Sequence, residues 1–412
     1  MKILVMGAGG QGGPCASILS KDPEITFIKL CDIDEKMLVN VKDKINSPKL
    51  HIEKADANDP NDVARVAEGM DAIIDLVTPS FFTNVMEGAL KSGCHYVNTA
   101  WEEYLYEGYE EDNVQLGQKL KYSDEFFEKK LTAILGCGMS SGYATNVIIS
   151  NTVGKMETVE SIKIRLAKKD TTINEEEEFI RPWNPGWNPR QALLDFVIPT
   201  YKYVDGQFIM MTEVFAEPEM WDFPEPVGKM LVSHHAHEEP FCLPFTYAEK
   251  GLKYCDFKYY VNKQVAPIVA LGLGQEEKIS VGGTEVSPLD VVLSFIPNPG
   301  DEFLNEDPTQ FDYADKTKVV AIMIEVIGME NGRKTKHLID VPPVNVPRKK
   351  MYDIYGTSMI SVSLPAVIGA KMAIEGTKKG VINPHEMDSD RFIELMRKSG
   401  HPAVWDDQVT EV

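Results

Sequence analysis

Hydrophobic and polar positions divide the chain into two parts with different patterns. Up to about residue 140, short apolar runs alternate with amphipathic stretches such as 62–69 and 82–92, which have helical spacing. The runs show little polar alternation, as strands do when both of their faces are covered. They span residues 2–6, 26–31, 49–54, 72–77, 95–98 and 131–135. This pattern predicts an α/β fold with a doubly wound parallel sheet.

Longer strands with alternating polarity follow after residue 141. They are predicted at 161–167, 252–261 and 319–327, with hairpin turns at 204–206 and 330–332. We therefore expect a second domain with a mixed or antiparallel sheet. Near the end of the chain, an apolar stretch rich in small residues at 358–375 predicts a closely packed helix.

A glycine-rich turn follows the first predicted strand. Residues 7–12 read Gly-Ala-Gly-Gly-Gln-Gly, which satisfies G-x-G-x-x-G, and they open a helical stretch. In such a turn Gly7 makes the tight bend, Gly9 lets backbone N–H groups approach a pyrophosphate, and Gly12 permits close packing of helix on strand. The order of strand, glycine turn and helix predicts a dinucleotide site, with a purely structural turn as the alternative.

Asp32 lies at the end of the second predicted strand, 20 residues after Gly12. A carboxylate there accepts hydrogen bonds from both ribose hydroxyls and repels a 2′-phosphate, so NAD is favoured over NADP. Further contacts are expected where the next strands end, because ligands lie at the carboxyl ends of parallel strands. For Thr78 a simple helix cap is the alternative. The predicted cofactor-binding residues are Gly7, Gly9, Gly10, Gln11, Gly12, Asp32, Ile33, Asp56, Ala57, Val77, Thr78, Pro79, Asn98 and Thr99.

Three of the eight histidines stand close together at the end of an apolar run in the second part, followed by Glu238 and Glu239. On a strand His235 and His237 share one face, and His234 takes the other. Dehydrogenation of an amine requires its neutral form, and hydrolysis of the resulting imine requires a base, tasks that suit histidine or a buried glutamate. We predict acid–base roles for His235, His237 and Glu238 or Glu239.

Two other interpretations of this cluster remain open. It can be a hydrated group of polar residues at a strand end. Alternatively, His235 and His237 can ligate a metal with a carboxylate as third ligand. No HExxH or CxxC motif and no second histidine pair completes a ligand set elsewhere in the sequence, so no metal is predicted.

A Trp- and Pro-rich stretch lies within 175–226, a segment that we expect to be a lid or an oligomer contact. Arg181 and Arg190 bracket two tryptophans there, one of which is Trp183. Guanidinium groups can clamp a substrate carboxylate, and the rings can enclose an aliphatic chain or an ammonium. These three residues and His234 are the predicted substrate-binding residues. Alternatively, the tryptophans form a dimer core and the arginines are solvated.

Composition narrows the classes of function. Lys and Arg number 42 against 63 Asp and Glu, and the resulting net charge of −21 would repel nucleic acid and anionic membranes. The six scattered cysteines form no CxxC pair, so neither a disulfide framework nor a thiolate zinc site is predicted. Because no run of 18 apolar residues and no basic leader occurs, we expect a cytoplasmic protein with a small-molecule substrate.

Five stretches resemble the saccharopine dehydrogenase-like family, in particular its lysine 6-dehydrogenase, saccharopine reductase and carboxynorspermidine dehydrogenase types. They are the opening Lys-Ile-Leu-Val-Met-Gly-Ala-Gly-Gly-Gln-Gly, Leu-Cys-Asp-Ile-Asp at 30–34, Lys-Ala-Asp-Ala-Asn-Asp at 54–59, Tyr-Val-Asn-Thr-Ala at 96–100 and Leu-Gly-Cys-Gly-Met-Ser-Ser-Gly at 135–142. The last stretch resembles the family's G-x-x-P-G linker, with Ser141 in place of the proline.

This resemblance implies a Rossmann-like domain of residues 1–140 plus 350–412, with an inserted α+β substrate-binding and dimerisation domain at 141–349. It also implies a homodimer that transfers hydride between a nicotinamide cofactor and the carbon beside an amine. We therefore predict an NAD(P)-dependent dehydrogenase or reductase for CH–NH or CH–NH2 groups of a lysine- or saccharopine-like substrate. A non-catalytic NAD-binding protein and a metal-dependent hydrolase that uses residues 234–239 are the alternatives.

Overall fold

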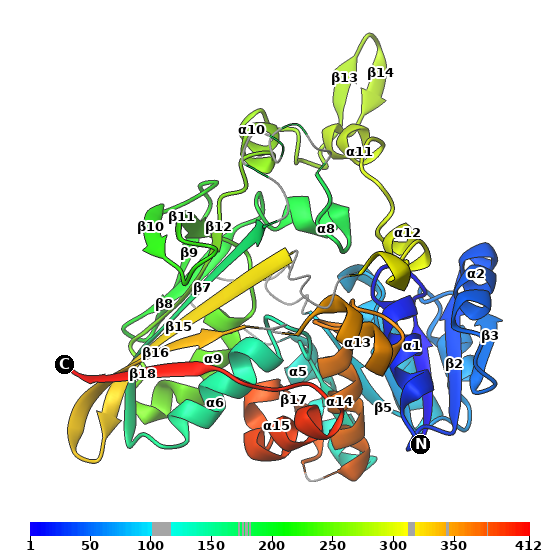
Figure 1. Cartoon of the computed structure of the whole chain (residues 1–412), viewed down its shortest axis with the longest axis horizontal. Coiled ribbons are helices and arrows are strands. Elements are labelled where there is room, and N and C mark those ends of the chain that lie inside the picture. The colour runs from blue at the N-terminus through cyan, green and yellow to red at the C-terminus, as the bar shows by residue number, and fades with distance from the viewer. Residues whose placement is uncertain are drawn as a thin grey trace. The chain divides into compact units, whose positions relative to one another are not determined.

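The computed structural model of the chain divides into two compact units (Figure 1). Unit 1 comprises Met1–Gly154, Gly300–Asp315 and Pro343–Val404, and unit 2 comprises Lys155–Pro299, Lys316–Pro342 and Trp405–Val412. Each unit has its own main sheet, and we describe the two separately. The residues that the structure describes are 1–100, 117–171, 174, 177, 180, 183–311, 318–342, 346–376 and 378–412.

Unit 1 contains a seven-stranded sheet in the order β17-β6-β5-β4-β1-β2-β3. All neighbouring strands are parallel. The strands are β1 (Lys2–Met6), β2 (Phe27–Asp32), β3 (Leu50–Lys54), β4 (Ala72–Asp75), β5 (His95–Asn98), β6 (Thr132–Ile134) and β17 (Gly380–Ile382). Because β1 lies between β2 and β4, the strand order reverses there, and ligands of such sheets bind outside the carboxyl ends of the strands at this point. The predicted doubly wound parallel sheet is confirmed.

Helices flank this sheet (Figure 1). They are α1 (Gly12–Lys21), α2 (Glu35–Ile45), α3 (Pro60–Ala67), α4 (Phe82–Ser92), α5 (Gly117–Glu128), α6 (Ile148–Val153), α12 (Pro299–Leu304), α13 (Arg348–Tyr355), α14 (Ser363–Glu375) and α15 (Ser389–Lys398). Local sequence sets several of their ends. The Asp34 carboxylate accepts the first free N–H groups of α2, and Asp59 does the same at α3. Gly93, with φ 73°, ends α4.

Two predicted elements are shorter in the structure, for local reasons. The strand predicted at 72–77 ends at Asp75, because the Asp75 carboxylate accepts the N–H of Val77 at 3.2 Å and the chain leaves the sheet there. The helix predicted at 358–375 begins only at Ser363. This start places Pro365 in the first helical turn, where its missing N–H breaks no helical hydrogen bond.

Unit 2 contains a nine-stranded mixed sheet with the path β10-β11-β12-β7-β15-β16-β18, while β8 pairs with β12 and β9. Its strands are β7 (Thr158–Asp170), β8 (Thr200–Val204), β9 (Gln207–Met211), β10 (Glu219–Asp222), β11 (Lys229–His234), β12 (Tyr254–Tyr260), β15 (Lys318–Glu330), β16 (Arg333–Val341) and β18 (Asp406–Glu411). Among the pairings of these nine strands in the described part of the chain, only β12–β7 is parallel. The predicted mixed sheet is confirmed.

The remaining elements of unit 2 are short. They are α8 (Pro189–Leu194), α9 (Glu239–Tyr247), α10 (Val265–Ala270), α11 (Pro288–Leu293) and the small hairpin of β13 (Ile279–Val281) and β14 (Thr284–Val286). Both predicted hairpin turns are present. Asp205 and Gly206 join β8 to β9, Asn331 and Gly332 join β15 to β16, and all four residues have positive φ. Two central residues with positive φ define the type I′ turn that suits the twist of a hairpin.

Strand β12 shows how the two faces of this sheet differ. Its side chains alternate, so Asp256 and Lys258 lie on one face while Phe257 and Tyr259 lie on the other. On the first face an apolar cluster that includes Phe223 borders the charged residues. We call the first face the charged face and the second the aromatic face.

The predicted domain limits, 1–140 plus 350–412 and 141–349, differ from the two units at both ends of the insertion. Residues 300–311 pack in unit 1, where Phe303 lies against Gly13 of α1. The last strand, β18, pairs with β16 and therefore belongs to unit 2. None of the helices in the described part of the chain has the length and hydrophobicity that crossing a bilayer requires.

Candidate functional site

The glycine turn of unit 1 has the geometry that each glycine was predicted to provide. Gly7 has φ +96°, and a Cβ there would lie 2.9 Å from the carbonyl oxygen of Leu76. A Cβ on Gly12 would lie 1.8 Å from the carbonyl oxygen of Gly7, so only glycine allows the helix to start this close to the strand. Around Gly9, by contrast, no atom lies within 4 Å of an added Cβ. The turn is therefore tight at both ends and open in the middle, which fits a pyrophosphate against the backbone.

Asp32, the last residue of β2, is held directly at this turn. Its carboxylate accepts the N–H of Ala8 at 2.7 Å and the N–H of Asp34 at 2.9 Å. Each carboxylate oxygen has two lone pairs, so both retain capacity for a ribose hydroxyl. The geometry fits the predicted role of Asp32, and the neighbouring Ile33 is 62% exposed beside it.

The other predicted cofactor residues lie along the same edge of the sheet, because they follow parallel strands. Asp56 is exposed after β3, and Ala57 is half-buried. Thr78 Oγ1 bonds to Ser80 Oγ at 3.0 Å rather than capping a helix, and Pro79 begins a short 3-10 turn (Pro79–Phe81). Gly10, Gln11, Val77 and Thr99 are half-buried.

Asn98 differs from its predicted neighbours because its side chain is fully buried. Its amide nitrogen donates to the hydroxyl of Tyr96 at 3.2 Å, and its amide oxygen accepts the N–H of Gly136 at 2.8 Å. The Tyr96 hydroxyl in turn donates to Asp75 at 2.8 Å. The side chain of Asn98 is therefore committed to the fold rather than presented to a ligand.

In unit 2 the predicted cluster at 234–239 is split between the two faces of the sheet. His234 ends β11 opposite Lys258 and lies on the charged face. Its Nε2 bonds to Glu217 at 3.1 Å, so the proton is on Nε2, since a carboxylate only accepts. Its Nδ1 is buried and has no hydrogen-bond partner in the described chain. Burial lowers the pKa of His234, which keeps the ring neutral.

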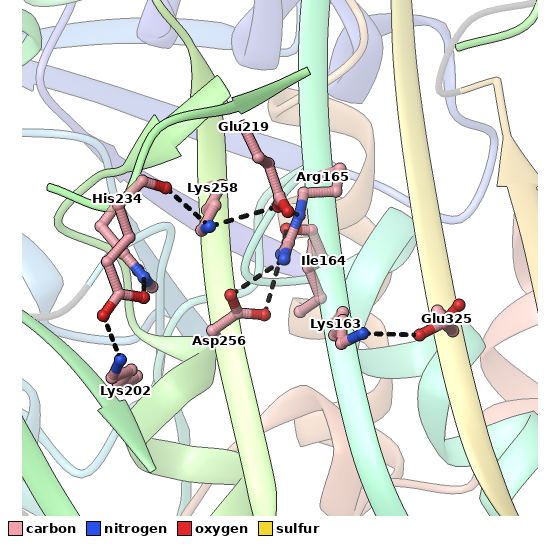
Figure 2. Close-up of polar contacts among 10 residues, drawn as sticks. Lys163, Ile164, Arg165, Lys202, Glu219, His234, Asp256, Lys258 and Glu325 are labelled. Atoms are coloured by element: carbon pink, nitrogen blue, oxygen red, sulfur yellow. Dashed lines mark hydrogen bonds and ion pairs between the residues drawn. The ribbon is translucent and has the colours of Figure 1, made fainter. Parts of the chain in front are cut away.

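The charged face holds a buried network of ion pairs around Arg165 (Figure 2). The guanidinium of Arg165 bonds to both oxygens of Asp256, at 2.8 and 2.9 Å, and to Glu219 at 2.7 Å. Lys258 pairs with Glu219 at 3.2 Å and donates to the carbonyl oxygen of Glu217 at 2.8 Å. Acidic and basic groups thus alternate across β10, β12 and β7, and the network is close to neutral.

His235 and His237 lie on the aromatic face instead. The ring of His237 stacks on Phe257, with centroids 3.9 Å apart, and the ring of His235 lies 4.8 Å from that of Tyr259. Phe196 contacts His235 edge-on at 4.6 Å. The prediction that His235 and His237 share one side while His234 takes the other therefore agrees with the structure, although β11 ends before His235.

The first residues of α9 supply two carboxylates to His237. Glu238 pairs with its Nδ1 at 3.1 Å, and Glu239 makes a still shorter contact with the same nitrogen. Glu239 is fully buried and Glu238 nearly so. Burial alone would lower the pKa of His237, but the carboxylates of Glu239 and Glu238 outweigh it and raise the pKa to about 9.

His235 is in the opposite protonation state. Burial, and then the charge of His237, lower the pKa of His235 to about 3. Its Nδ1 lies 3.1 Å from the carbonyl oxygen of Ala236, and because that oxygen only accepts, the proton is on Nδ1 and the lone pair on Nε2. At neutral pH the pair therefore consists of a neutral ring that can accept a proton and a cationic ring that cannot.

Asp195 is a member of this site that the sequence did not reveal. It follows α8, and its backbone carbonyl accepts the N–H of Ala236 at 3.1 Å, which ties the histidine segment to α8. Burial raises the pKa of Asp195 to about 7, while the hydrogen bond from Gln191 at 2.7 Å and then the charge of His237 oppose that shift. Nothing in the local pattern marks this aspartate, because its neighbour at 236 is distant in sequence.

The predicted substrate clamp has a mixed outcome. Arg181 lies outside the described residues. Trp183 packs against an apolar cluster of its own unit that includes Phe196, the residue that contacts His235. Arg190 bonds to Glu276 at 2.6 Å and also to Asp290, so a substrate carboxylate would have to compete with both.

Three residues of the cluster form a group with the chemistry of a metal site. One ligand atom each from His237, Glu238 and Glu239 lies within 4.8 Å of the others. His235 does not belong to this group, so the predicted alternative of a His235–His237 ligand pair is not the arrangement found among the described residues. A cation there would have to displace the proton of His237.

Comparison with known proteins shows what the nucleotide site is similar to. Residues 3–135 match the family model described as saccharopine dehydrogenase NADP binding domain. This stretch of unit 1 is therefore similar to that domain. The predicted resemblance is confirmed, and the glycine turn and Asp32 lie inside the matched NADP-binding domain.

Two relatives are similar to nearly the whole chain at low identity. Carboxyaminopropylagmatine dehydrogenase of Synechocystis is 22% identical, over 97% of this chain and 96% of the relative. Carboxynorspermidine synthase of Vibrio alginolyticus is 21% identical, over 97% and 95%.

Two solved structures share the fold. Saccharopine dehydrogenase (L-Glu forming) of Saccharomyces cerevisiae has a TM-score of 0.68 at 13% identity and covers 100% of this chain and 99% of its own. Homospermidine synthase of Legionella pneumophila, in complex with NAD, has a TM-score of 0.60 at 12% identity, with 100% and 91% covered. The chain is thus similar to enzymes of this group over both units.

Proposed function

We propose that the protein is an NAD-dependent dehydrogenase or reductase that interconverts a secondary amine and an imine. The observation that carries this proposal is the similarity to carboxyaminopropylagmatine dehydrogenase, which extends over 97% of the chain and therefore includes both the NADP-binding domain and the unit with the buried histidines. The name of that relative describes agmatine with a propyl group that bears a carboxyl and an amino substituent. Our proposed substrate class is a polyamine-like amine joined to such an amino-acid fragment.

The chemistry divides between the cofactor and the chain. Bound nicotinamide supplies or accepts the hydride at the carbon beside the nitrogen. In the oxidative direction the CH–NH group loses a hydride and a proton to become C=N, and water then cleaves the imine to a carbonyl compound and a free amine. The proton needs an acceptor, and His235 is the proposed first relay, because its ring is neutral and carries its lone pair on Nε2. With a pKa of about 3 it is a weak base, so the proton has to move on to a group with a pKa near working pH.

His237 has a different proposed role. With Glu238 and Glu239 it forms a fixed ion group beside His235, and its positive charge disfavours a second cation on His235. His235 would therefore pass the proton on rapidly rather than store it. Asp195, whose pKa of about 7 lies near working pH, is the proposed acceptor of that proton.

NAD rather than NADP is the proposed cofactor. Asp32 supports it, because a carboxylate fixed at the glycine turn would lie beside a 2′-phosphate and repel it. The family model is named for NADP, and the Legionella homospermidine synthase was solved with NAD. A titration of both dinucleotides against the same protein sample separates the two.

The test of the proposed function follows nicotinamide absorbance in both directions. Reduction of NAD is measured with lysine, saccharopine and carboxylated polyamines, and oxidation of NADH with an agmatine- or diamine-type amine plus an aldehyde that bears an amino-acid group. We expect turnover with a secondary amine and a large loss, about 100-fold or more in kcat/KM, in His235→Ala. Turnover with lysine alone would favour the lysine-dehydrogenase type. Turnover that survives in His235→Ala would remove this base from the mechanism.

The group of His237, Glu238 and Glu239 favours one second candidate, a metal-dependent hydrolase. Metal analysis of protein purified without chelator tests it. Stoichiometric zinc, lost together with activity in His237→Ala, would support the hydrolase. Turnover of an amine with NAD in protein treated with a chelator would support the dehydrogenase.

A further inference from the structure

A chain of buried polar side chains connects the carboxyl ends of three neighbouring strands in unit 1. Asp75, the last residue of β4, accepts the Tyr96 hydroxyl at 2.8 Å. The same hydroxyl accepts the amide of Asn98 at 3.2 Å, at the end of β5. Asn98 then accepts the N–H of Gly136, which follows β6, at 2.8 Å. Asp75, Tyr96 and Asn98 are each fully buried, and we call them the strand-end relay.

The relay also fixes the backbone that leaves each strand. Asp75 accepts the N–H of Val77 at 3.2 Å, and the carbonyl oxygen of Asn98 accepts the N–H of Cys137 at 2.7 Å. Leu76, between Asp75 and Val77, supplies the carbonyl oxygen against which Gly7 of the glycine turn packs. A change in the position of Asp75 would therefore move Leu76, which packs directly against the glycine turn.

These contacts lie on the side of the switch point where the nicotinamide half of a dinucleotide is expected. The adenine half belongs over β2 and β3, where Asp32 stands, and the other half over β4 and β5. Hydrophobic side chains alone could pack the ends of these strands together. Burying a carboxylate there costs free energy, so its presence indicates a role that an apolar side chain cannot fill.

We propose that Asp75, Tyr96 and Asn98 are positioning residues that set the affinity for the nicotinamide half of the cofactor. The proposal rests on nucleotide binding in the proposed function and adds residues that touch neither cofactor nor substrate. Asp75 orients the Val77–Pro79 turn, and Asn98 orients the start of the loop after β5 and the Gly136–Cys137 turn. Asn98, predicted from sequence to touch the cofactor, acts instead through these turns.

The protonation of Asp75 gives the relay a measurable signature. Burial raises the pKa of Asp75 to about 7, while the bonds from Tyr96 and Val77 oppose the shift. No charged side chain of the described chain contributes to this shift in the pKa of Asp75. On the helices that pack against β4, the charged residues have other partners: Lys91 bonds to Asn61, Lys371 to Asp22 and Glu24, Glu375 to Arg391, and Glu87 to Tyr122.

As a carboxylate, Asp75 accepts both hydrogen bonds. When Asp75 is protonated, its own O–H group needs a further hydrogen-bond acceptor. The relay is therefore complete above about pH 7 and disturbed below it. Nucleotide affinity should rise as pH increases from 6 to 8 in the wild type. In Asp75→Asn this rise should be absent, and in Tyr96→Phe it should move to higher pH, because that variant removes a bond that lowers the pKa of Asp75.

The experiment measures the Kd of NADH by fluorescence at pH 6, 7 and 8 for the wild type, Asp75→Asn, Tyr96→Phe and Thr132→Val. Thr132 is the matched control, since it is also buried in this sheet and bonds to the carbonyl oxygen of Lys378, but it lies at the amino end of β6. We expect affinity at pH 8 to fall about tenfold in both relay variants and to be unchanged in Thr132→Val. Thermal unfolding at pH 8 should leave Asp75→Asn at least as stable as the wild type, because the variant removes a buried charge.

Each outcome decides between the two proposals. A wild-type chain that binds neither NADH nor NADPH would overturn the relay together with the proposed function. Wild-type binding with an unchanged Kd and pH dependence in Asp75→Asn would overturn the relay alone. Loss of affinity in Thr132→Val as large as in the relay variants would show a general effect of sheet stability, which contradicts positioning. Binding that follows the expected pattern without amine turnover would support the relay and count against the proposed reaction.

Discussion

At the scale of single residues, the protonation states of neighbouring histidines decide what each can do. His235 and His237 are two positions apart, yet one is held neutral and the other cationic. The difference comes from their partners: His237 faces Glu238 and Glu239, whereas His235 faces aromatic rings and the charge of His237. Residue type alone would have given both rings the same role.

The raised pKa of His237 makes a prediction about stability. Because the folded pKa, about 9, lies above the ordinary value of 6.5, the stabilisation is fully present below pH 6.5 and is lost as pH rises through 9. Each pKa unit is worth about 1.4 kcal/mol, so the wild type should lose on the order of 3 kcal/mol more than His237→Gln between pH 6 and pH 10. Denaturant unfolding across this range measures the difference.

The matched control for this measurement is His51→Gln, which changes an exposed histidine of unit 1. It shows how much the removal of a histidine outside the ion group changes the free energy of unfolding. Parallel curves for the wild type and His237→Gln would contradict the ion group at His237.

Asp32 makes a prediction about cofactor choice. In Asp32→Asn one oxygen still accepts a backbone N–H, but the negative charge is gone. We expect the ratio of NADP to NAD affinity to rise about tenfold or more, because the repulsion of a 2′-phosphate disappears. Isothermal titration with both dinucleotides checks it, with Asp34→Asn, the neighbouring helix cap, as control. An unchanged ratio of the two affinities would mean that Asp32 does not lie beside the ribose of the bound dinucleotide.

At the scale of elements, ion pairs connect strands of the mixed sheet of unit 2 in addition to the backbone hydrogen bonds. Arg165 on β7 is 2% exposed and bonds to the fully buried Asp256 on β12. A charge left alone in such a place costs far more than an exposed ion pair contributes. The charged face should therefore be sensitive to a substitution that removes one partner of this pair.

Removal of one partner should show this sensitivity. Arg165→Met leaves Asp256 without its two guanidinium bonds, and we expect a loss of about 3–5 kcal/mol in the free energy of unfolding. The double variant Arg165→Met, Asp256→Leu should recover a large part of it. Arg333→Met, which breaks an exposed pair with Glu411 on the same sheet, should cost less than about 1 kcal/mol. Equal losses in the two single variants would contradict the buried pair.

At the scale of the whole molecule, the order of the chain and the division into units do not coincide. The chain begins in unit 1 and then forms most of unit 2. It returns to unit 1 twice, and its last strand, β18, belongs to unit 2. β18 pairs with β16, and Asp407 bonds to the buried His337 at 2.9 Å. The C-terminal residues thus belong to the unit that does not contain the nucleotide site.

A chain that ends at Val404 tests this division. Loss of β18 exposes the edge of β16 and leaves His337 without Asp407, so unit 2 should lose about 2 kcal/mol of stability. Nucleotide affinity should stay within about twofold of the wild type, because the glycine turn and the strand-end relay lie in unit 1. Limited proteolysis and NADH titration of the same sample measure both. Loss of nucleotide binding in the shortened chain would contradict the independence of the two units.

The sequence by itself determined the features that depend on near neighbours. The glycine turn, Asp32 after the second strand, the alternation of the strands and both hairpin turns could be predicted, because backbone conformation and side-chain direction are local properties. The same local logic correctly separated His234 from His235 and His237. It placed the start of the closing helix too early, since that start depends on packing partners elsewhere.

Only the tertiary structure decided which charges meet. Arg165 and Asp256 are 91 residues apart, and no spacing rule connects them. From the sequence, Asp75 was a residue of a predicted strand and Asn98 a predicted cofactor contact. That Tyr96 links the two side chains follows only from the pairing of β4 with β5. Likewise the neutral state of His235 required knowing that Phe196 and Tyr259 surround it. Burial and electrostatic partnership are properties of the folded chain, because both depend on distances that the order of residues does not contain.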